Sequence, residues 1–200
     1  MPNNMFYIPV ILGSTRRGRR SARAAYFIAD RMKQTERIEP EILDLGEYDF
    51  PMLEERLRFR DDPPPRILEF SGKLSRADAL VIVTPEYNNS YPGVLKNCLD
   101  YFKPEYRRKP IGIVTVSAAE FGGVNCLAHL RLVTLAMSAF PIPVSLPIAK
   151  VEERIREDGT LIDSSLESKA ETFLSELIWF TEAITARKEL DQPRANEQSR

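Results

Sequence analysis

The sequence predicts an α/β protein with a doubly wound parallel sheet and helices on both of its faces. Short apolar runs recur along the 200-residue chain. The clearest run, residues 79–84 (ALVIVT), is apolar up to its last residue, as expected of a strand that is covered on both sides. Segments with apolar residues at helical spacing lie between successive runs, and a helix between two strands makes those strands parallel.

The expected elements alternate regularly along the chain. We expect strands at residues 6–12, 38–45, 79–84, 110–117 and 141–146, and helices at residues 21–33, 66–77, 92–102, 124–139 and 164–188. Pro40 interrupts the second strand and places it nearer a sheet edge. Pro92 suits the first turn of its helix, where the missing N–H would be unpaired anyway.

Five such strand–helix units suit the flavodoxin-like strand order 2-1-3-4-5. In that order a ligand binds beyond the carboxyl ends of the strands, at the switch point between strands 1 and 3. We expect residues 1–188 to form one domain and residues 189–200 to be a polar tail. The long proline-containing connection at residues 46–66 is typical of a functional lid or a partner surface.

Composition excludes several classes of protein. The formal net charge is −1, with both signs mixed among 28 % charged residues, which argues against a nucleic-acid partner. There is no run of about 20 apolar residues and no signal-peptide pattern, so we expect no membrane partner and a cytoplasmic protein. Two separated cysteines, Cys98 and Cys126, indicate a reducing compartment, and with a single histidine they leave no expected metal site.

The first loop, residues 13–21 (GSTRRGRRS), joins the first strand to the first helix. Free backbone N–H groups and the helix dipole favour an anion there, and hydroxyl and guanidinium groups add donors. A Walker loop would need Lys and then Ser or Thr after the second glycine, and the dinucleotide pattern G-x-G-x-x-G is absent. The loop therefore predicts a phosphate monoester site, with the candidate ligands Ser14, Arg16, Arg19 and Ser21.

Two further loops carry a resemblance to a known family. Residues 13–16 (GSTR) and 85–100 (PEYNNSYPGVLKNCLD) resemble the NADPH-dependent FMN reductases, flavodoxin-like enzymes that include quinone, azo-dye and chromate reductases. Residues 117–123 (SAAEFGG) resemble that family's third flavin loop, and the likeness spans about residues 7–145. The resemblance implies that the flavin ring is lined by Pro85, Glu86, Tyr87 and Asn88, and its pyrimidine edge by Ser117, Ala118 and Gly122.

The same resemblance implies an activity. NADPH would pass a hydride to non-covalently bound FMN, which would then reduce a flavin, quinone, azo compound or oxidised metal species in a ping-pong reaction. We place Arg17 and Arg20 on the surface or near the NADPH phosphate. No catalytic side chain is expected because the cofactor performs the chemistry, and we expect a structural or interface role for Glu86. The resemblance also implies a homodimer or a dimer of dimers, for which the helix at 92–102 and the connection at 46–66 are the candidate surfaces.

Two alternatives stay open. In the first, the protein would be a non-enzymatic electron carrier of the flavodoxin type. In the second, it would bind FMN only as a passing substrate. Carriers are usually strongly acidic and their phosphate loop lacks an arginine cluster, which makes the carrier the weaker hypothesis for this nearly neutral chain.

Overall fold

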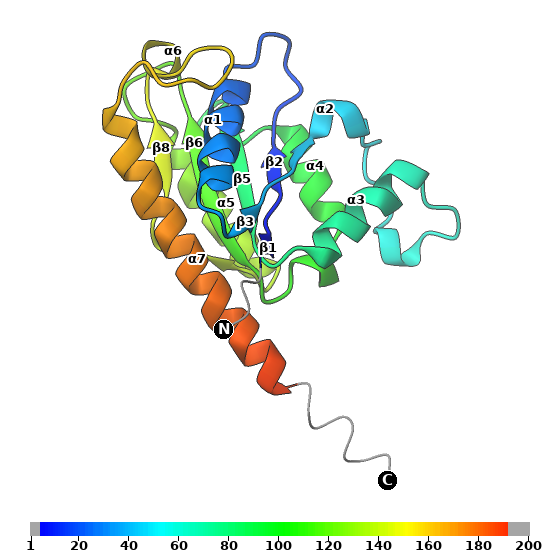
Figure 1. Cartoon of the computed structure of the whole chain (residues 1–200). Helices are drawn as coiled ribbons and strands as arrows, with labels where there is room; N and C mark the ends of the chain where they lie inside the picture. Colours follow the sequence, from blue (N-terminus) through cyan, green and yellow to red (C-terminus); the bar gives the residue numbers. More distant parts are fainter. Residues whose placement is uncertain (1–4, 192–200) are drawn as a thin grey trace.

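The computed structural model describes residues 5–191, in which a parallel sheet carries helices on both faces (Figure 1). Six short strands form the main sheet: β2 (Val10–Leu12), β4 (Ile42–Asp44), β5 (Leu80–Pro85), β6 (Pro110–Val116), β7 (Phe140–Pro141) and β8 (Leu146–Ile148). Their order is β4-β2-β5-β6-β7, and β8 also pairs with β6. The expected α/β class is confirmed. The expected sheet of five strands in the order 2-1-3-4-5 is not confirmed, since the main sheet has six strands.

Prolines explain the extra strands, because a proline has no backbone N–H to donate to a neighbouring strand. The predicted first and second strands are each divided, by Pro9 and Pro40, and their first halves, β1 (Phe6–Tyr7) and β3 (Ile38–Glu39), pair as a separate two-stranded sheet. The predicted fifth strand is likewise replaced by β7 and β8, with Pro143 between them.

The helices and 3-10 turns are α1 (Ser21–Gln34), α2 (Leu45–Tyr48), η1 (Leu57–Phe59), α3 (Pro65–Arg76), α4 (Gly93–Tyr101), η2 (Pro104–Tyr106), α5 (Val124–Ala136), α6 (Val151–Arg154) and α7 (Ser165–Asp191). The five predicted helices are confirmed, whereas the short helices α2 and α6 were not predicted. Helix α7 continues three residues into the predicted tail, and residues 192–200 of that tail lie outside the described residues. Within residues 5–191, no helix combines the length and the apolar character that crossing a bilayer demands.

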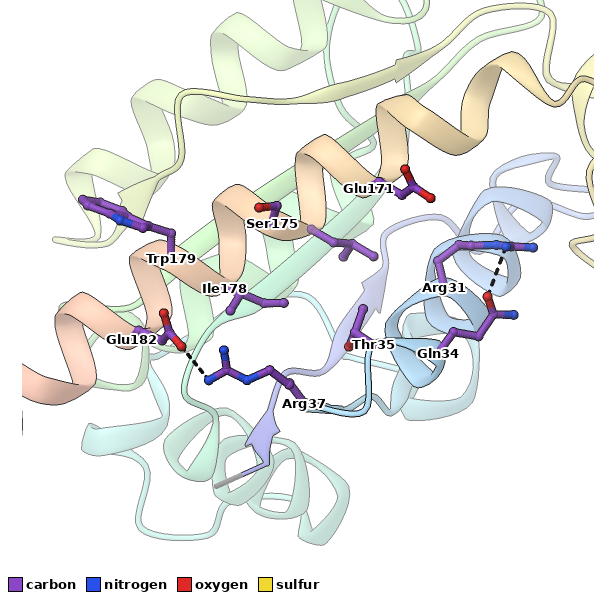
Figure 2. Close-up of a pocket in the computed structure, with 10 residues that line it drawn as sticks. Arg31, Gln34, Thr35, Arg37, Glu171, Ser175, Ile178, Trp179 and Glu182 are labelled. Atoms are coloured by element: carbon purple, nitrogen blue, oxygen red, sulfur yellow. Dashed lines mark hydrogen bonds and ion pairs between the residues drawn. The ribbon is translucent and has the colours of Figure 1, made fainter. Parts of the chain in front are cut away.

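Helices α1 and α7 lie on the same face of the sheet, and a groove runs between them (Figure 2). Its volume is about 580 Å³, and it is lined by residues from the carboxyl end of α1, the segment directly after it and the middle of α7. The Arg37 guanidinium pairs with Glu182 at 2.5 Å across this groove. The groove lies away from the loops that follow β2, β5 and β6.

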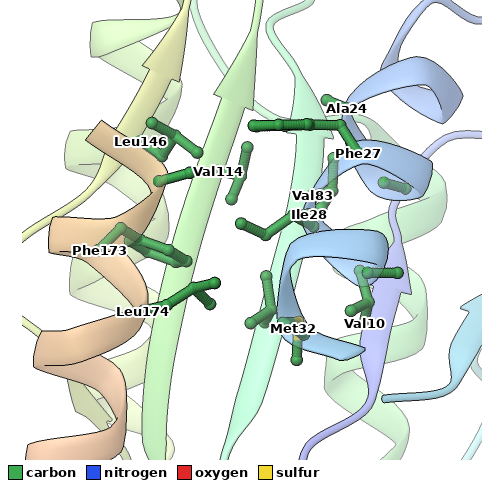
Figure 3. Close-up of a cluster of buried hydrophobic side chains, with 14 of the residues drawn as sticks. Val10, Ala24, Phe27, Ile28, Met32, Val83, Val114, Leu146, Phe173 and Leu174 are labelled. Atoms are coloured by element: carbon green, nitrogen blue, oxygen red, sulfur yellow. The ribbon is translucent and has the colours of Figure 1, made fainter. Parts of the chain in front are cut away.

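The core explains the layered arrangement. Alternate residues of each central strand point to opposite faces, so that Val10 and Val83 pack beneath α1 and α7 while Ile11 and Ile82 pack beneath α3, α4 and α5. Phe27 of α1 and Phe173 of α7 fill the first of these clusters (Figure 3). Because both faces are buried, the carboxyl ends of the strands, with their loops, are where the sheet opens to a ligand.

Candidate functional site

The loops after β2, β5 and β6 meet at the carboxyl edge of the sheet and enclose a cavity of about 440 Å³, here called the strand-end cavity. Its lining comprises Arg16, Arg17, Gly18, Arg19, Arg20, Ser21, Pro85, Glu86, Tyr87, Val116, Ser117, Ala118 and Ala119. The structure therefore brings most of the predicted site residues together from three loops that are far apart in sequence.

Three predicted residues lie beside the cavity instead of lining it. Ser14 is fully buried, and its Oγ lies 2.9 Å from the phenolic oxygen of Tyr87. Asn88 lines an adjoining open hollow together with Arg16, Glu86 and Tyr87. Gly122 packs behind the third loop, where its N–H donates to Ser117 Oγ at 3.1 Å. These residues can shape the wall of the cavity.

The first loop presents an uncapped helix terminus to the cavity. Helix α1 has no acidic residue in its first turn, and its N-cap, Arg20, makes no side-chain capping bond. The hydroxyl of Ser21 is buried and has no hydrogen-bond partner among residues 5–191. A buried polar group without a partner costs about 1–3 kcal/mol, so an acceptor is expected to meet it when the site is filled. These features fit an anion such as a phosphate monoester.

The arginines of this loop divide into two pairs. Arg19 forms an ion pair with Asp44, and Arg20 pairs with Glu152 at 2.9 Å. Arg16 and Arg17 form no ion pair within the described part of the chain, and the Arg16 guanidinium lies 5.8 Å from the centre of the Tyr87 ring. Arg16 and Arg17 are therefore the cations that remain available to an anionic ligand.

The second loop is a tight reversal at the end of β5. Tyr87 N–H donates to the Ser90 carbonyl at 2.7 Å, and Ser90 N–H donates back at 3.0 Å. The two central residues, Asn88 and Asn89, have φ angles of 50° and 63°. Asparagine tolerates this left-handed region better than other residues with a side chain. The Asn-Asn pair is a turn signal that the sequence analysis did not use.

Glu86 has a structural role in this loop. Its Oε2 accepts the backbone N–H of Cys126 at 3.0 Å, and Cys126 is the third residue of α5. The carboxylate thus caps α5 from a distance and lies at the positive end of its dipole. Burial raises the pKa of the neighbouring Cys126 thiol to about 12, so this cysteine stays protonated and unreactive at neutral pH.

The third loop depends on two glycines in the left-handed region, Gly122 with φ 63° and Gly123 with φ 83°. A Cβ on Gly123 would lie 3.0 Å from the Cβ of Thr115, and the Thr115 hydroxyl donates to the Gly122 carbonyl at 2.6 Å. The glycines therefore allow the loop to turn tightly over the end of β6 and leave backbone groups of residues 117–119 at the cavity.

Sequence reasoning missed some residues of the site. Val116 and Ala119 line the cavity through their places at the end of β6 and in its loop, and no chemical signal marks them. Arg17 was assigned to the surface or to NADPH, and it lines the cavity. Asp44 also went unnoticed, although an acidic residue at a strand end beside an arginine-rich loop is a usable signal.

Comparisons with known proteins identify the family and the fold of this chain. The family described as NADPH-dependent FMN reductase matches residues 7–153. An FMN-dependent NADPH-azoreductase of Staphylococcus aureus is 28 % identical over 179 residues, which cover 86 % of this chain and 93 % of the relative. Two solved structures share the fold. FerB, a flavoenzyme NAD(P)H:(acceptor) oxidoreductase from Paracoccus denitrificans, superposes with a TM-score of 0.73 at 22 % identity, covering 89 % of this chain and 98 % of FerB. A flavodoxin, WrbA-like protein from Agrobacterium tumefaciens superposes with a TM-score of 0.60 at 17 % identity, covering 88 % of this chain and 98 % of that protein.

Proposed function

We propose that this chain, which belongs to the NADPH-dependent FMN reductase family, reduces a small electron acceptor by a ping-pong reaction in the strand-end cavity. Membership of the family makes it an oxidoreductase with FMN as cofactor and NADPH as co-substrate. FMN bound non-covalently would supply the redox chemistry, taking a hydride from NADPH and giving it to the acceptor. The protein contributes binding, orientation and a suitable electrostatic environment.

One observation supports the placement of FMN most directly. The buried hydroxyl of Ser21, which has no hydrogen-bond partner in the described part of the chain, lies at the amino end of α1 and lines the cavity. A phosphate monoester there would accept a hydrogen bond from that hydroxyl and from first-turn N–H groups, while Arg16 and Arg17 would balance its charge.

The second and third loops suit the ring of a flavin. Pro85 and Tyr87 line the cavity from the second loop, and residues 117–119 line it from the third. The hydrogen bond between Tyr87 and Ser14 joins the second loop to the first, which fixes the distance between the phosphate end and the ring end of the proposed site. No side chain here is required to transfer a proton, and Glu86 is already engaged in capping α5.

The acceptor would bind beside the ring. The hollow formed by Arg16, Glu86, Tyr87 and Asn88 adjoins the strand-end cavity and is open to solvent, so a flat molecule has access from outside. We propose a flavin, quinone, azo compound or oxidised metal species as the acceptor, a range supported by the azoreductase and oxidoreductase names of the relatives.

We also propose that two copies of the chain pair through α5. This helix and its flanks expose large apolar side chains, namely Phe121, Val124, Leu132, Leu135 and Phe140. The only formal charge on α5 belongs to Arg131, so a second copy related by a two-fold axis would meet little like charge. Sequence reasoning favoured the 92–102 helix and the 46–66 connection, where Met52 and Phe59 are also exposed. Sedimentation of wild type and Leu132→Glu distinguishes these surfaces, since only the α5 interface predicts that this variant is monomeric.

Anaerobic mixing of the FMN-loaded protein with NADPH tests the proposed reaction. We expect the flavin absorbance to bleach with NADPH and to return when a quinone or an azo dye is added. A protein that binds FMN and is not reduced by NADPH would be an electron carrier instead. If purified protein binds no added FMN, both hypotheses fail.

A further inference from the structure

Arg19 was predicted to bind phosphate, but its guanidinium is already engaged by the protein on two sides. Nη2 pairs with the carboxylate of Asp44, and Nη1 donates to the carbonyl oxygen of Ser14 at 2.8 Å. The side chains of Arg19 and Asp44 are only 20 % and 13 % exposed, so solvent screens this pair weakly. Arg19 thus holds a backbone carbonyl of the first loop and a carboxylate of β4 together.

The surroundings are shaped for this contact. Asp44 is the N-cap of α2, and its Oδ1 accepts the Gly46 N–H at 2.8 Å, which orients the carboxylate toward Arg19. A Cβ at Gly46 would lie 2.8 Å from Arg19 Nη1. The absence of a side chain at this position therefore leaves the space that the guanidinium occupies.

The contacts of Arg19 act on the part of the chain that forms the proposed phosphate site. Asp44 pairs in register with Leu12, directly before Gly13, so it is a fixed point on the neighbouring strand. Arg19 N–H also donates to the Arg16 carbonyl at 3.1 Å, in a turn that contains Gly18 with φ 66°. By holding the Ser14 carbonyl, Arg19 keeps a negative oxygen away from an anion and sets the path of residues 14–19.

We propose that Arg19, Asp44 and Gly46 form a clamp that preorganises the first loop for a phosphate monoester, with Arg19 as a positioning residue and Arg16 and Arg17 as the available cations. This inference rests on the proposed function and assigns to Arg19 a different role from the direct phosphate ligand that the sequence suggested. A preformed loop binds its ligand more tightly because little of the binding free energy is spent on ordering the loop.

The Asp44→Asn variant distinguishes a clamp from a direct ligand by the sign of its effect. Asparagine also caps helices and retains an oxygen for the Gly46 N–H, so the change mainly removes the ion pair. If Arg19 bound phosphate directly, losing Asp44 would free it and remove a nearby negative charge, and FMN would bind equally well or more tightly. If Arg19 is part of a clamp, FMN binding weakens.

The experiment measures dissociation constants for FMN and for riboflavin, which lacks the phosphate, with wild type and with Arg19→Gln, Asp44→Asn and the double variant. We expect each single change to weaken FMN binding about tenfold, the size of one charge-assisted hydrogen bond, and to leave riboflavin binding within about twofold. We expect the double variant to lose no more than either single variant, because both belong to one unit. Gly46→Ala, which keeps both charged groups and crowds Arg19, should also weaken FMN selectively, and it replaces Asp44→Asn if that protein does not fold.

The outcomes are separable. Wild type that binds FMN, together with an Asp44→Asn variant that binds it equally or more tightly, overturns the clamp and leaves the proposed function standing. Equal losses for FMN and riboflavin would also overturn it, since the effect would not act through the phosphate. Wild type that binds neither flavin would overturn the proposed function, and the clamp with it.

Discussion

The groove between α1 and α7 and the strand-end cavity differ in how far the protein satisfies the polar groups that line them. In the groove between α1 and α7, Arg37 is paired with Glu182, and Arg31 donates to Gln34 at 3.1 Å (Figure 2). Arg31 also donates to Glu167 at 2.6 Å. In the strand-end cavity, Ser21 Oγ, Arg16 and Arg17 have no such partners within residues 5–191.

Volume alone would favour the groove as the ligand site, since the groove measures about 580 Å³ and the strand-end cavity about 440 Å³. Buried polar groups are normally satisfied, so those that are not mark the place where a ligand completes the structure. Arg31 Nε, beside the groove, is also buried without a hydrogen-bond partner among residues 5–191, but Nη1 of the same guanidinium already donates to Glu167 and Gln34. Unsatisfied groups together with an uncapped helix terminus distinguish a site from a surface depression better than size does.

The largest effect is expected where the cavity wall depends on backbone conformation. Gly123→Ala places a Cβ at a φ of 83° and 3.0 Å from Thr115 Cβ, which should destabilise the fold by about 2 kcal/mol and weaken FMN binding. Gly72→Ala is the matched control, because nothing lies within 4 Å of that Cβ and α3 should gain up to about 1 kcal/mol. Thermal unfolding measures both, and equal effects in the two variants would contradict this account of the third loop.

The next prediction compares Arg16 of the strand-end cavity with Arg37 of the groove. Arg16→Ala should weaken FMN binding by about 1–3 kcal/mol because a charge-assisted contact with the phosphate is lost. Arg37→Ala removes an ion pair in the groove, and it should change stability by less than about 1 kcal/mol and leave FMN binding unaltered. An unchanged dissociation constant in Arg16→Ala would remove Arg16 from the site.

A smaller effect with two opposite signs is expected at Ser21. Ser21→Ala removes a buried hydroxyl that has no partner within the described residues, so the flavin-free protein should be as stable as wild type or slightly more stable. FMN binding should weaken by about 1 kcal/mol because one donor to the phosphate is lost. Chemical denaturation and flavin titration of the same variant provide the two numbers. A loss of stability with unchanged affinity would make Ser21 a purely structural residue.

The smallest effect is expected at Trp179, which is 60 % exposed beside the groove and meets Phe180 edge-to-face at 5.0 Å. Trp179→Ala should lower the free energy of unfolding by about 0.5 kcal/mol through loss of that aromatic pair. FMN affinity and the rate of reduction by NADPH should stay at the wild-type values. A drop in either would show that the groove takes part in the reaction.

The sequence was informative where the signal is local. The turn at residues 13–21, the strand before it and the helix after it could be predicted because glycines, hydroxyls and apolar spacing all lie within a short segment. The strand count was wrong because Pro9, Pro40 and Pro143 interrupt pairing at positions where the apolar pattern continues.

Contacts between residues that are far apart in the sequence could not be predicted from it. Asp44 reaches Arg19 only through the register of β4 on β2, and Glu86 caps α5 across forty residues of sequence. Residue type alone therefore suggested that Arg19 faces a ligand, whereas its carboxylate partner depends on the packing of the whole sheet.

Titration of the flavin-free wild-type protein with FMN and with riboflavin tests the central claim most directly, because the two ligands differ only in the phosphate. The account predicts that FMN binds at least about thirtyfold more tightly, equivalent to about 2 kcal/mol for a phosphate held by a helix terminus, a hydroxyl and unpaired arginines. Equal affinity for the two flavins would contradict it, since the first loop would then contribute nothing to binding.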